Sequence, residues 1–213
     1  MKMPTLLVCS CAIVLIAANS PAPSPSYTND FEKAEVGKAP DDMMILDGTF
    51  AVREVDGNKC LELAPDPVGS YGALFGPEGM TAMDVKARIW AASSGKRFPE
   101  AGIGVDDAGG YKLFLIPAKH TLELRKGDDP VASVPFDWKD GGWTWLRLRI
   151  EPKDEKTWAI SGKAWAQPQS EPEKWTISAS DAEAPSAGKA SLWGSDFSEQ
   201  PIRFDDLSVT PVK

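Results

Sequence analysis

The chain is poor in histidine and cysteine, and this scarcity restricts its chemistry. Among 213 residues it has one histidine, His120, and three cysteines, of which Cys9 and Cys11 lie in the N-terminal apolar run. A metal site built from several histidines is therefore excluded, and a Ser-His-Asp triad would have to use His120. If the apolar run is cleaved, only Cys60 remains, so we expect no intrachain disulfide.

Positive charge is also in short supply. The chain has 23 Lys and Arg residues against 31 Asp and Glu residues, which gives a formal net charge of −8. Contacts with phosphate groups need a basic surface, so nucleic acid is not expected as a partner.

No hydrophobic run is long enough to cross a membrane. The run from Leu6 to Ala18 follows a single charged residue, Lys2. About a dozen residues fall short of the ~20 that a membrane span needs, but they suit the apolar part of a secretion signal. We predict a cleaved signal over residues 1–20, a Pro/Ser-rich extended tail over residues 21–29, and export to the periplasm, the cell surface or the medium.

After the signal, the sequence lacks the apolar spacing of amphipathic helices and instead alternates with a period of two. Its 18 Gly, 18 Pro and 8 Trp residues suit short strands joined by turns. We predict one all-β domain over residues 30–213, an antiparallel β-sandwich or jelly roll of about a dozen strands. The expected strands cover residues 50–55, 60–64, 83–90, 101–105, 111–116, 121–126, 131–136, 143–151, 157–165, 175–179, 189–193 and 202–210.

Strand alternation places four tryptophans on faces that are otherwise polar. Sugars present apolar C–H faces edged by hydroxyl groups, so flat aromatic rings beside polar side chains suit them. If these strands are neighbours, their outer face is an aromatic and basic platform for sugars, acidic sugars included. The alternative is that the rings belong to the core. The candidate ligand-binding residues are Arg88, Trp90, Trp143, Trp145, Arg147, Lys163 and Trp165.

Two acidic pairs lie near the ends of the predicted domain. Asp30 and Glu32 are near its first strand, and Asp205 and Asp206 are in its last. Calcium takes several carboxylate and carbonyl oxygens, and the termini of such sandwiches often meet, so these four acids are a candidate structural calcium site. The alternative is that they are ordinary solvated acids of an acidic chain.

Several stretches carry a resemblance to a known family. They are Asn29–Glu32 with Gly37 and Gly48–Val52, then Trp143–Ile150, Ile160–Trp165 with Pro172–Trp175, and Ile202–Val209. Together they resemble the concanavalin A-like lectin/glucanase superfamily, particularly its laminin-G-like and 3-keto-disaccharide hydrolase-like (DUF1080-type) domains of exported bacterial proteins. The resemblance implies a jelly-roll sandwich. It does not identify the chemistry, because the superfamily contains lectins, glycosidases, lyases and modules without a known ligand.

The catalytic motif of the superfamily's glucanases is missing. Those enzymes supply paired carboxylates from one strand in a Glu-x-Asp-x-x-Glu pattern. The nearest approach here, Glu54 to Lys59, ends in a lysine and is typical of a hairpin turn. His120 precedes a short strand, where we expect it to end a turn, and no partner for it as a general acid or base is identifiable.

We therefore expect a monomeric, noncatalytic, lectin-like module that binds a polysaccharide or another glycan. Two alternatives stay open. A glycoside hydrolase or lyase would draw its acids from positions such as Asp84, Glu100 or Asp106, and a cleft with two facing carboxylates would favour it. A cell-surface protein-interaction module would be favoured by a flat apolar patch without a groove.

Overall fold

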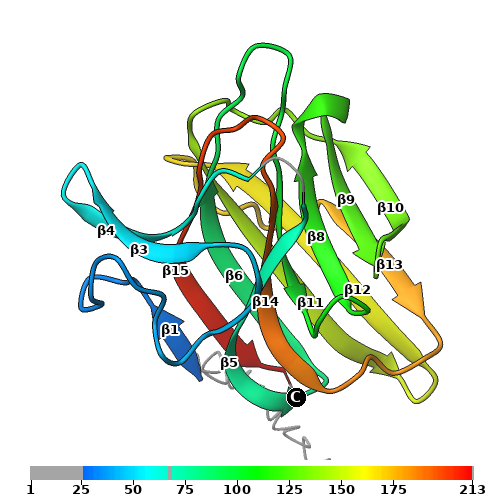
Figure 1. Cartoon of the computed structure of the whole chain (residues 1–213). Helices are drawn as coiled ribbons and strands as arrows, with labels where there is room; N and C mark the ends of the chain where they lie inside the picture. The colour runs from blue at the N-terminus through cyan, green and yellow to red at the C-terminus, as the bar shows by residue number, and fades with distance from the viewer. Residues whose placement is uncertain (1–25, 67–68, 213) are drawn as a thin grey trace, which may run out of the picture.

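Two antiparallel sheets pack face to face in the computed structural model, which describes residues 26–66 and 69–212 (Figure 1). Sheet A has eight strands, and β1 (Tyr27–Asn29) pairs with β15 outside the main path. The path runs β13 (Ile177–Asp181), β12 (Thr157–Ala166), β11 (Trp143–Asp154), β6 (Met83–Trp90), β15 (Ile202–Pro211), β4 (Asn58–Leu63) and β3 (Phe50–Val55).

Sheet B has seven strands and lies against sheet A. A short 3-10 helix, η1 (Pro117–Lys119), connects β8 to β9. The strands run β10 (Asp129–Pro135), β9 (Thr121–Lys126), β8 (Tyr111–Ile116), β7 (Glu100–Val105), β14 (Gly188–Ser195), β5 (Tyr71–Met80) and β2 (Met44–Asp47). The predicted fold class, an all-β antiparallel sandwich, is therefore confirmed.

The core lies between the sheets because central strands bury alternate side chains. In sheet A, Val85 of β6 pairs with Leu148 of β11, and both side chains are fully buried. In sheet B, Ile103 of β7 pairs with Leu113 of β8, and these are fully buried as well. Burial of each such side chain stabilises the fold by about 1.5–3 kcal/mol, so this interlayer core positions the polar outer faces.

The twelve predicted strands all overlap observed ones, and β3, β6, β8 and β9 have the predicted bounds. Three strands, β1, β2 and β5, were not predicted, so the count is 15 rather than about a dozen. Strand β5 was not predicted because it contains glycines, which are typical of turns. A Cβ at Gly72 would lie 2.8 Å from the Trp193 ring, and Gly76 has φ +75°, so both positions need glycine inside a strand.

The described residues begin inside the stretch predicted as a tail. The predicted signal, residues 1–20, lies outside the described residues, and so does most of the predicted tail, residues 21–29. Tyr27 nevertheless pairs with Val209 of β15, and its ring centroid lies 5.7 Å from that of Phe75. This aromatic contact and the strand pairing explain why the sheet starts before residue 30.

The predicted turns occur where the sequence places them. The hairpin over residues 54–59 joins β3 to β4 through Asp56 at φ 54° and Gly57 at φ 78°. His120 ends η1 in the left-handed region at φ 54°. Within the described ranges, no helix combines the length and the apolar character that crossing a bilayer requires.

Candidate functional site

The seven candidate ligand-binding residues lie together on the outer face of sheet A. Trp143 pairs with Trp90, and Trp145 pairs with both Arg88 and Trp165 across neighbouring strands. Strand alternation therefore predicts their face correctly. The structure divides them into an open group, Arg88, Trp90 and Trp143, which lines a pocket, and a network group, Trp145, Arg147, Lys163 and Trp165, which lies outside it.

The open group lines a pocket of about 290 Å³, which we call the Trp90–Trp143 pocket. Hairpin β3–β4 forms one wall, and strands β6, β11 and β15 form the floor. The lining residues are Val55, Asp56, Asn58, Cys60, Arg88, Trp90, Trp143, Gln167 and Arg203.

Stacked cations fix the two rings of this pocket. The Arg88 guanidinium carbon lies 4.6 Å from the Trp143 ring centroid, and the Arg203 guanidinium carbon lies 4.3 Å from the Trp90 ring centroid. The Trp90 indole also donates a hydrogen bond of 2.8 Å to the carbonyl of Gly141. Both tryptophans are half-buried, so the pocket presents aromatic surface whose orientation is set before any ligand arrives.

A buried carboxylate anchors the floor of the pocket. Asp205 is fully buried and accepts hydrogen bonds from Arg88 Nη2 at 2.6 Å and Asn58 Nδ2 at 2.8 Å. Burial raises the pKa of Asp205, outweighing the Asn58 hydrogen bond and the Arg88 charge that lower it. Arg88 Nη1 reaches Gln167 at 3.3 Å. This network orients the polar side chains beside the rings.

Cys60 borders the pocket without being a reactive thiol. Its side chain is buried, and burial raises its pKa to about 11, so it stays protonated at neutral pH. A neutral thiol is a poor nucleophile. A catalytic cysteine is therefore not supported here.

Three of the four acids of the predicted calcium site are held by other groups. Arg88 binds Asp205 at 2.6 Å and Asp206 at 2.8 Å, and Glu32 accepts a backbone N–H of the β3–β4 hairpin at 2.9 Å. Asp30 and Asp206 line a separate pocket of about 480 Å³ beside β1. Among the described residues, no three or more His, Cys, Asp or Glu side chains gather as a metal site. Calcium at these acids stays a prediction.

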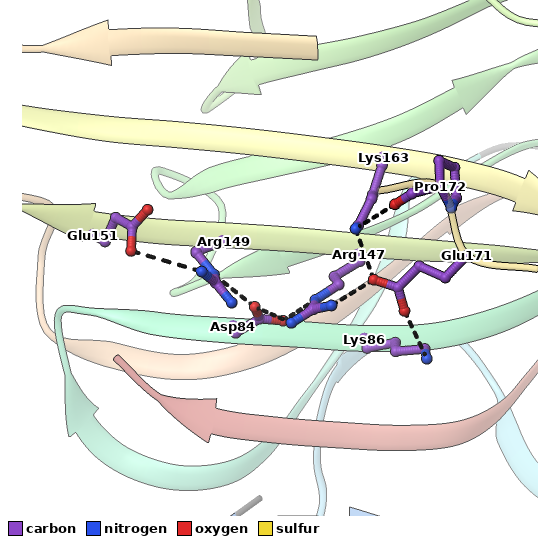
Figure 2. Close-up of polar contacts among 8 residues, drawn as sticks. All are labelled: Asp84, Lys86, Arg147, Arg149, Glu151, Lys163, Glu171 and Pro172. Carbon is purple, nitrogen blue, oxygen red and sulfur yellow. Dashed lines mark hydrogen bonds and ion pairs between the residues drawn. The ribbon is translucent and has the colours of Figure 1, made fainter. Parts of the chain in front are cut away.

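Arg147 and Lys163 of the network group belong to an ion-pair network on β6, β11 and β12 (Figure 2). Asp84, only 5% exposed, accepts two hydrogen bonds from Arg147 at 2.7 and 2.8 Å and one from Arg149 at 2.7 Å. Figure 2 shows Asp84 between these two arginines. Bidentate pairing of this kind is strong and directional, so it fixes the arginines along the sheet.

Glu171 reaches the same network from the connection between β12 and β13. Its carboxylate lies 2.8 Å from Lys163 Nζ and 3.2 Å from Lys86 Nζ, and it also binds Arg147 (Figure 2). Burial opposes ionisation of Glu171, but the hydrogen bonds from Lys163 and Arg147 outweigh it and lower the pKa to about 2. This part of the face therefore strongly favours a carboxylate.

Three tryptophans flank these cations. Trp145 and Trp165 are stacked with centroids 5.9 Å apart and an angle of 11°, and Lys86 Nζ lies 4.5 Å from the Trp145 ring. Trp175, which was not among the predicted residues, lies 4.8 Å from Lys163 Nζ. We call Lys86, Arg147, Arg149 and Lys163, with these three rings, the cationic platform.

A second polar group lies on the outer face of sheet B, and it was not predicted from the sequence. Arg125 Nη2 lies 2.8 Å from Glu123 and 3.4 Å from Glu100, and its guanidinium carbon lies 4.7 Å from the Phe114 ring centroid. Burial raises the pKa of Glu123, but hydrogen bonds from Arg125 and Lys119 outweigh it and lower the pKa overall. Glu123 and Arg125 are two residues apart in β9 and therefore lie on the same face of the strand. This alternation was the signal in the sequence that could have revealed the group.

The three acids considered for an enzyme lie apart. Asp84 is held by two arginines on sheet A, whereas Glu100 faces Arg125 on sheet B. Asp106 follows β7 at φ 70° and borders a small pocket of about 120 Å³. Glu100 shares its face with Glu123, and Asp84 shares its face with Glu151 and Glu171, but in each case arginine side chains lie between the carboxylates.

Comparisons with known proteins give the fold. Neither a protein-family model nor a curated protein matches this chain. The metal-free carbohydrate recognition domain of Emp46p covers 91% of this chain and 100% of that chain, with a TM-score of 0.59 and 14% identity. The VIP36 exoplasmic/lumenal domain, in its Ca²⁺/Man3GlcNAc-bound form, covers 91% of both chains, with a TM-score of 0.57 and 5% identity.

A lyase has a similar structure. The PL-14 alginate lyase from Aplysia kurodai covers 88% of this chain and 100% of that chain, with a TM-score of 0.59 and 9% identity. At these identities the likeness extends to the fold alone. The chain therefore shares the jelly-roll β-sandwich fold of these domains.

Proposed function

We propose that the chain is an exported, noncatalytic glycan-binding module whose sugar site is the Trp90–Trp143 pocket. The observation that carries the proposal is the pairing of two fixed, half-buried tryptophan rings with amide and guanidinium groups in one pocket. The rings suit the C–H faces of a sugar, and the polar groups suit its hydroxyls.

The dimensions of the pocket fit this role. At about 290 Å³, it is near the lower end of the ~300–1,000 Å³ usual for small-ligand sites. It therefore suits one or two sugar units of a longer chain. One copy of the protein supplies every residue that lines the pocket. The proposed function therefore needs no oligomer, and we propose that the chain acts as a monomer.

The shared fold supports glycan as the ligand class. Carbohydrate recognition domains and an alginate lyase have the same architecture at low identity. Export rests on the apolar run before residue 20 and agrees with the lumenal origin of the VIP36 domain.

A glycan panel with pocket variants tests the proposal. We expect Trp143→Ala and Gln167→Ala to reduce binding of a selected glycan at least about tenfold, because each removes a contact surface or a hydrogen-bonding group. Gln169→Ala is the matched control, since Gln169 is exposed and does not line the pocket. If no glycan binds the wild-type chain, or if Gln169→Ala weakens binding as much as Gln167→Ala, the proposal is wrong.

One observation favours a glycan-cleaving enzyme as a second candidate. Glu100 and Glu123 approach the same Arg125 nitrogen on the outer face of sheet B. Hydrolysis needs one carboxyl group whose pKa is raised so that it can donate a proton, whereas Arg125 helps to lower the pKa of Glu123. Release of reducing ends from a polysaccharide, abolished by Glu100→Gln, would favour this candidate.

The protein-interaction alternative has less support. Among the described residues, the large exposed apolar side chains are Val36, Met44, Leu46, Val131 and Phe197. Only Met44 and Leu46 share a strand, the edge strand β2. Single exposed apolar residues are ordinary on soluble proteins.

A further inference from the structure

We infer that the cationic platform is a second ligand site, which binds the carboxylate of a uronic acid in a polysaccharide, and that Glu171 occupies this site in the unliganded chain. The inference rests on the proposed function, since both place glycan on the outer face of sheet A. It adds a ligand class and a separate group of residues. The platform adjoins the pocket through the pairing of Trp145 with Arg88.

When the carboxylate of Glu171 is not counted, positive charge clearly exceeds negative charge on the cationic platform. Four cationic side chains, Lys86, Arg147, Arg149 and Lys163, contact three carboxylates, which belong to Asp84, Glu171 and Glu151. Asp84 is fixed on β6 beneath the arginines, and Glu151 only touches Arg149, at 3.9 Å. Without Glu171, four cations face two carboxylates, so the platform is left attractive to an anion.

Glu171 differs from the strand residues of the network because its backbone is not part of the sheet. It lies on no strand, but in segment 167–176 between β12 and β13. Backbone hydrogen bonds fix the ends of the segment, from Gln169 N to Ala166 O and from Thr176 N to Gly162 O, both at 2.9 Å. Between these two, the described chain has no backbone–backbone hydrogen bond. The middle of the segment is held by the Glu171 carboxylate and by Lys163, whose Nζ donates to the carbonyl of Pro172 at 2.8 Å.

The groups around the Glu171 carboxylate are of the kind that would recognise a uronate. Three cations converge on it, from β6, β11 and β12 (Figure 2). Aromatic rings lie beside the same cations, Trp145 next to Lys86 and Trp175 next to Lys163. A uronic acid combines a carboxylate with an apolar C–H face, so it makes both contacts at once. A neutral sugar makes only one of them.

Exposure leaves room for exchange. The side chain of Glu171 is 27% exposed, and those of Arg147 and Lys86 are 26% and 31% exposed. Water therefore reaches the pairs of Glu171 with Lys86 and Arg147, whereas Lys163 is only 7% exposed. A carboxylate from solution can compete with that of Glu171 for the Lys86 and Arg147 nitrogen atoms. Such competition predicts that removing the Glu171 charge improves binding.

Binding of polygalacturonate to the full chain, measured by titration calorimetry at low salt, tests the inference. We expect Glu171→Gln to bind at least about tenfold more tightly than the wild type, because an internal competitor for the cations is lost. Glu173→Gln is the control, since it makes the same change in net charge at an exposed residue of the same segment. Uncharged dextran serves as the neutral probe, and its binding should not respond to Glu171→Gln.

Two further variants keep the test decisive. Lys86→Gln combined with Glu171→Gln should lose the gain, because Lys86 is one of the three cations at the site. Glu171→Asp keeps the charge but shortens its reach, so it should give a smaller gain even if Glu171→Gln does not fold. No polygalacturonate binding by any variant, or an equal gain from Glu173→Gln, overturns the inference.

The two proposals can fail separately. The pair Glu171→Gln and Glu173→Gln is repeated in a Trp143→Ala background. If the Trp90–Trp143 pocket is not a sugar site, the gain from Glu171→Gln persists in that background, whereas the glycan-panel result for Trp143→Ala is negative. If the platform is not a uronate site, the gain is absent in both backgrounds.

Discussion

Glu171→Gln should destabilise the fold at neutral pH and have little effect in acid. The substitution removes the charge that joins segment 167–176 to Lys86, Arg147 and Lys163 while keeping the shape of the side chain. A carboxyl group whose pKa is lower in the folded chain stabilises it above the unfolded pKa, and this contribution is lost as the pH falls toward the folded pKa. The stabilisation from Glu171 is therefore complete above about pH 5 and declines below that.

The magnitude follows from the lowered pKa. A fall from the ordinary value of 4.5 to about 2 corresponds to about 3 kcal/mol, at ~1.4 kcal/mol for each tenfold change in an equilibrium constant. The side chain is 27% exposed, and solvent screening reduces the contribution of such ion pairs. We expect Glu171→Gln to lower the free energy of unfolding by about 1–2 kcal/mol at pH 7, and by less than half of that near pH 3.

Urea unfolding of the wild type and the variant at a series of pH values measures this difference directly. Glu173→Gln is the control and should change the free energy of unfolding by less than about 0.5 kcal/mol at every pH. A loss for Glu171→Gln that stays constant from pH 7 to about pH 3 would refute the assignment of the lowered pKa to this network. An equal loss for Glu173→Gln would show that net charge, rather than the contacts of Glu171, sets stability.

Three further predictions concern packing, the buried thiol and the arginine clamp. Gly72→Ala places a Cβ 2.8 Å from the buried Trp193 ring, so we expect a loss of about 1–3 kcal/mol in urea unfolding. Gly109→Ala, where the nearest atom is 3.7 Å away, should be close to neutral, and similar losses for both would contradict the packing argument. Burial raises the pKa of Cys60 to about 11, so its thiol should resist a disulfide-exchange reagent in the folded chain. It should react once urea unfolds the chain. Fast reaction of the native chain would show that Cys60 is not buried. Asp84→Ala leaves two partly buried arginines without their carboxylate, and we expect a loss of about 2–4 kcal/mol, so a loss under ~1 kcal/mol would contradict the clamp.

Most strands of the fold were predictable because one face of each is buried. The period-two pattern predicted the bounds of β3, β6, β8 and β9 and the face of every candidate tryptophan. It failed at β5, where the close approach of Trp193 requires Gly72 and a bulge requires Gly76 at φ +75°. Glycine is read as a turn signal in a sequence, and only the neighbouring strand reveals that it makes room for a ring.

The candidate site was only partly predictable, for a different reason. Alternation tells which face a side chain occupies, but it does not tell what covers that face. Trp143 is in an open pocket and Trp165 is 5% exposed, although both lie on the same face of sheet A. Trp165 stacks on Trp145 and lies 5.2 Å from Lys86 Nζ. These contacts come from neighbouring strands, which the alternation within one strand does not identify. The Glu100, Glu123 and Arg125 group was missed because β7 and β9 meet only through β8.

The place of β15 in sheet A has a consequence for synthesis of the chain. This strand is near the C-terminus, yet it lies between β6 and β4 and also pairs with β1. A nascent chain that still lacks β15 cannot join β3 and β4 to the rest of the sheet, and Tyr27 has no partner strand. Closure of sheet A therefore waits for β15, which follows every other strand of the described chain. Until β15 pairs, apolar strand faces stay exposed, and such partly folded states are prone to aggregation.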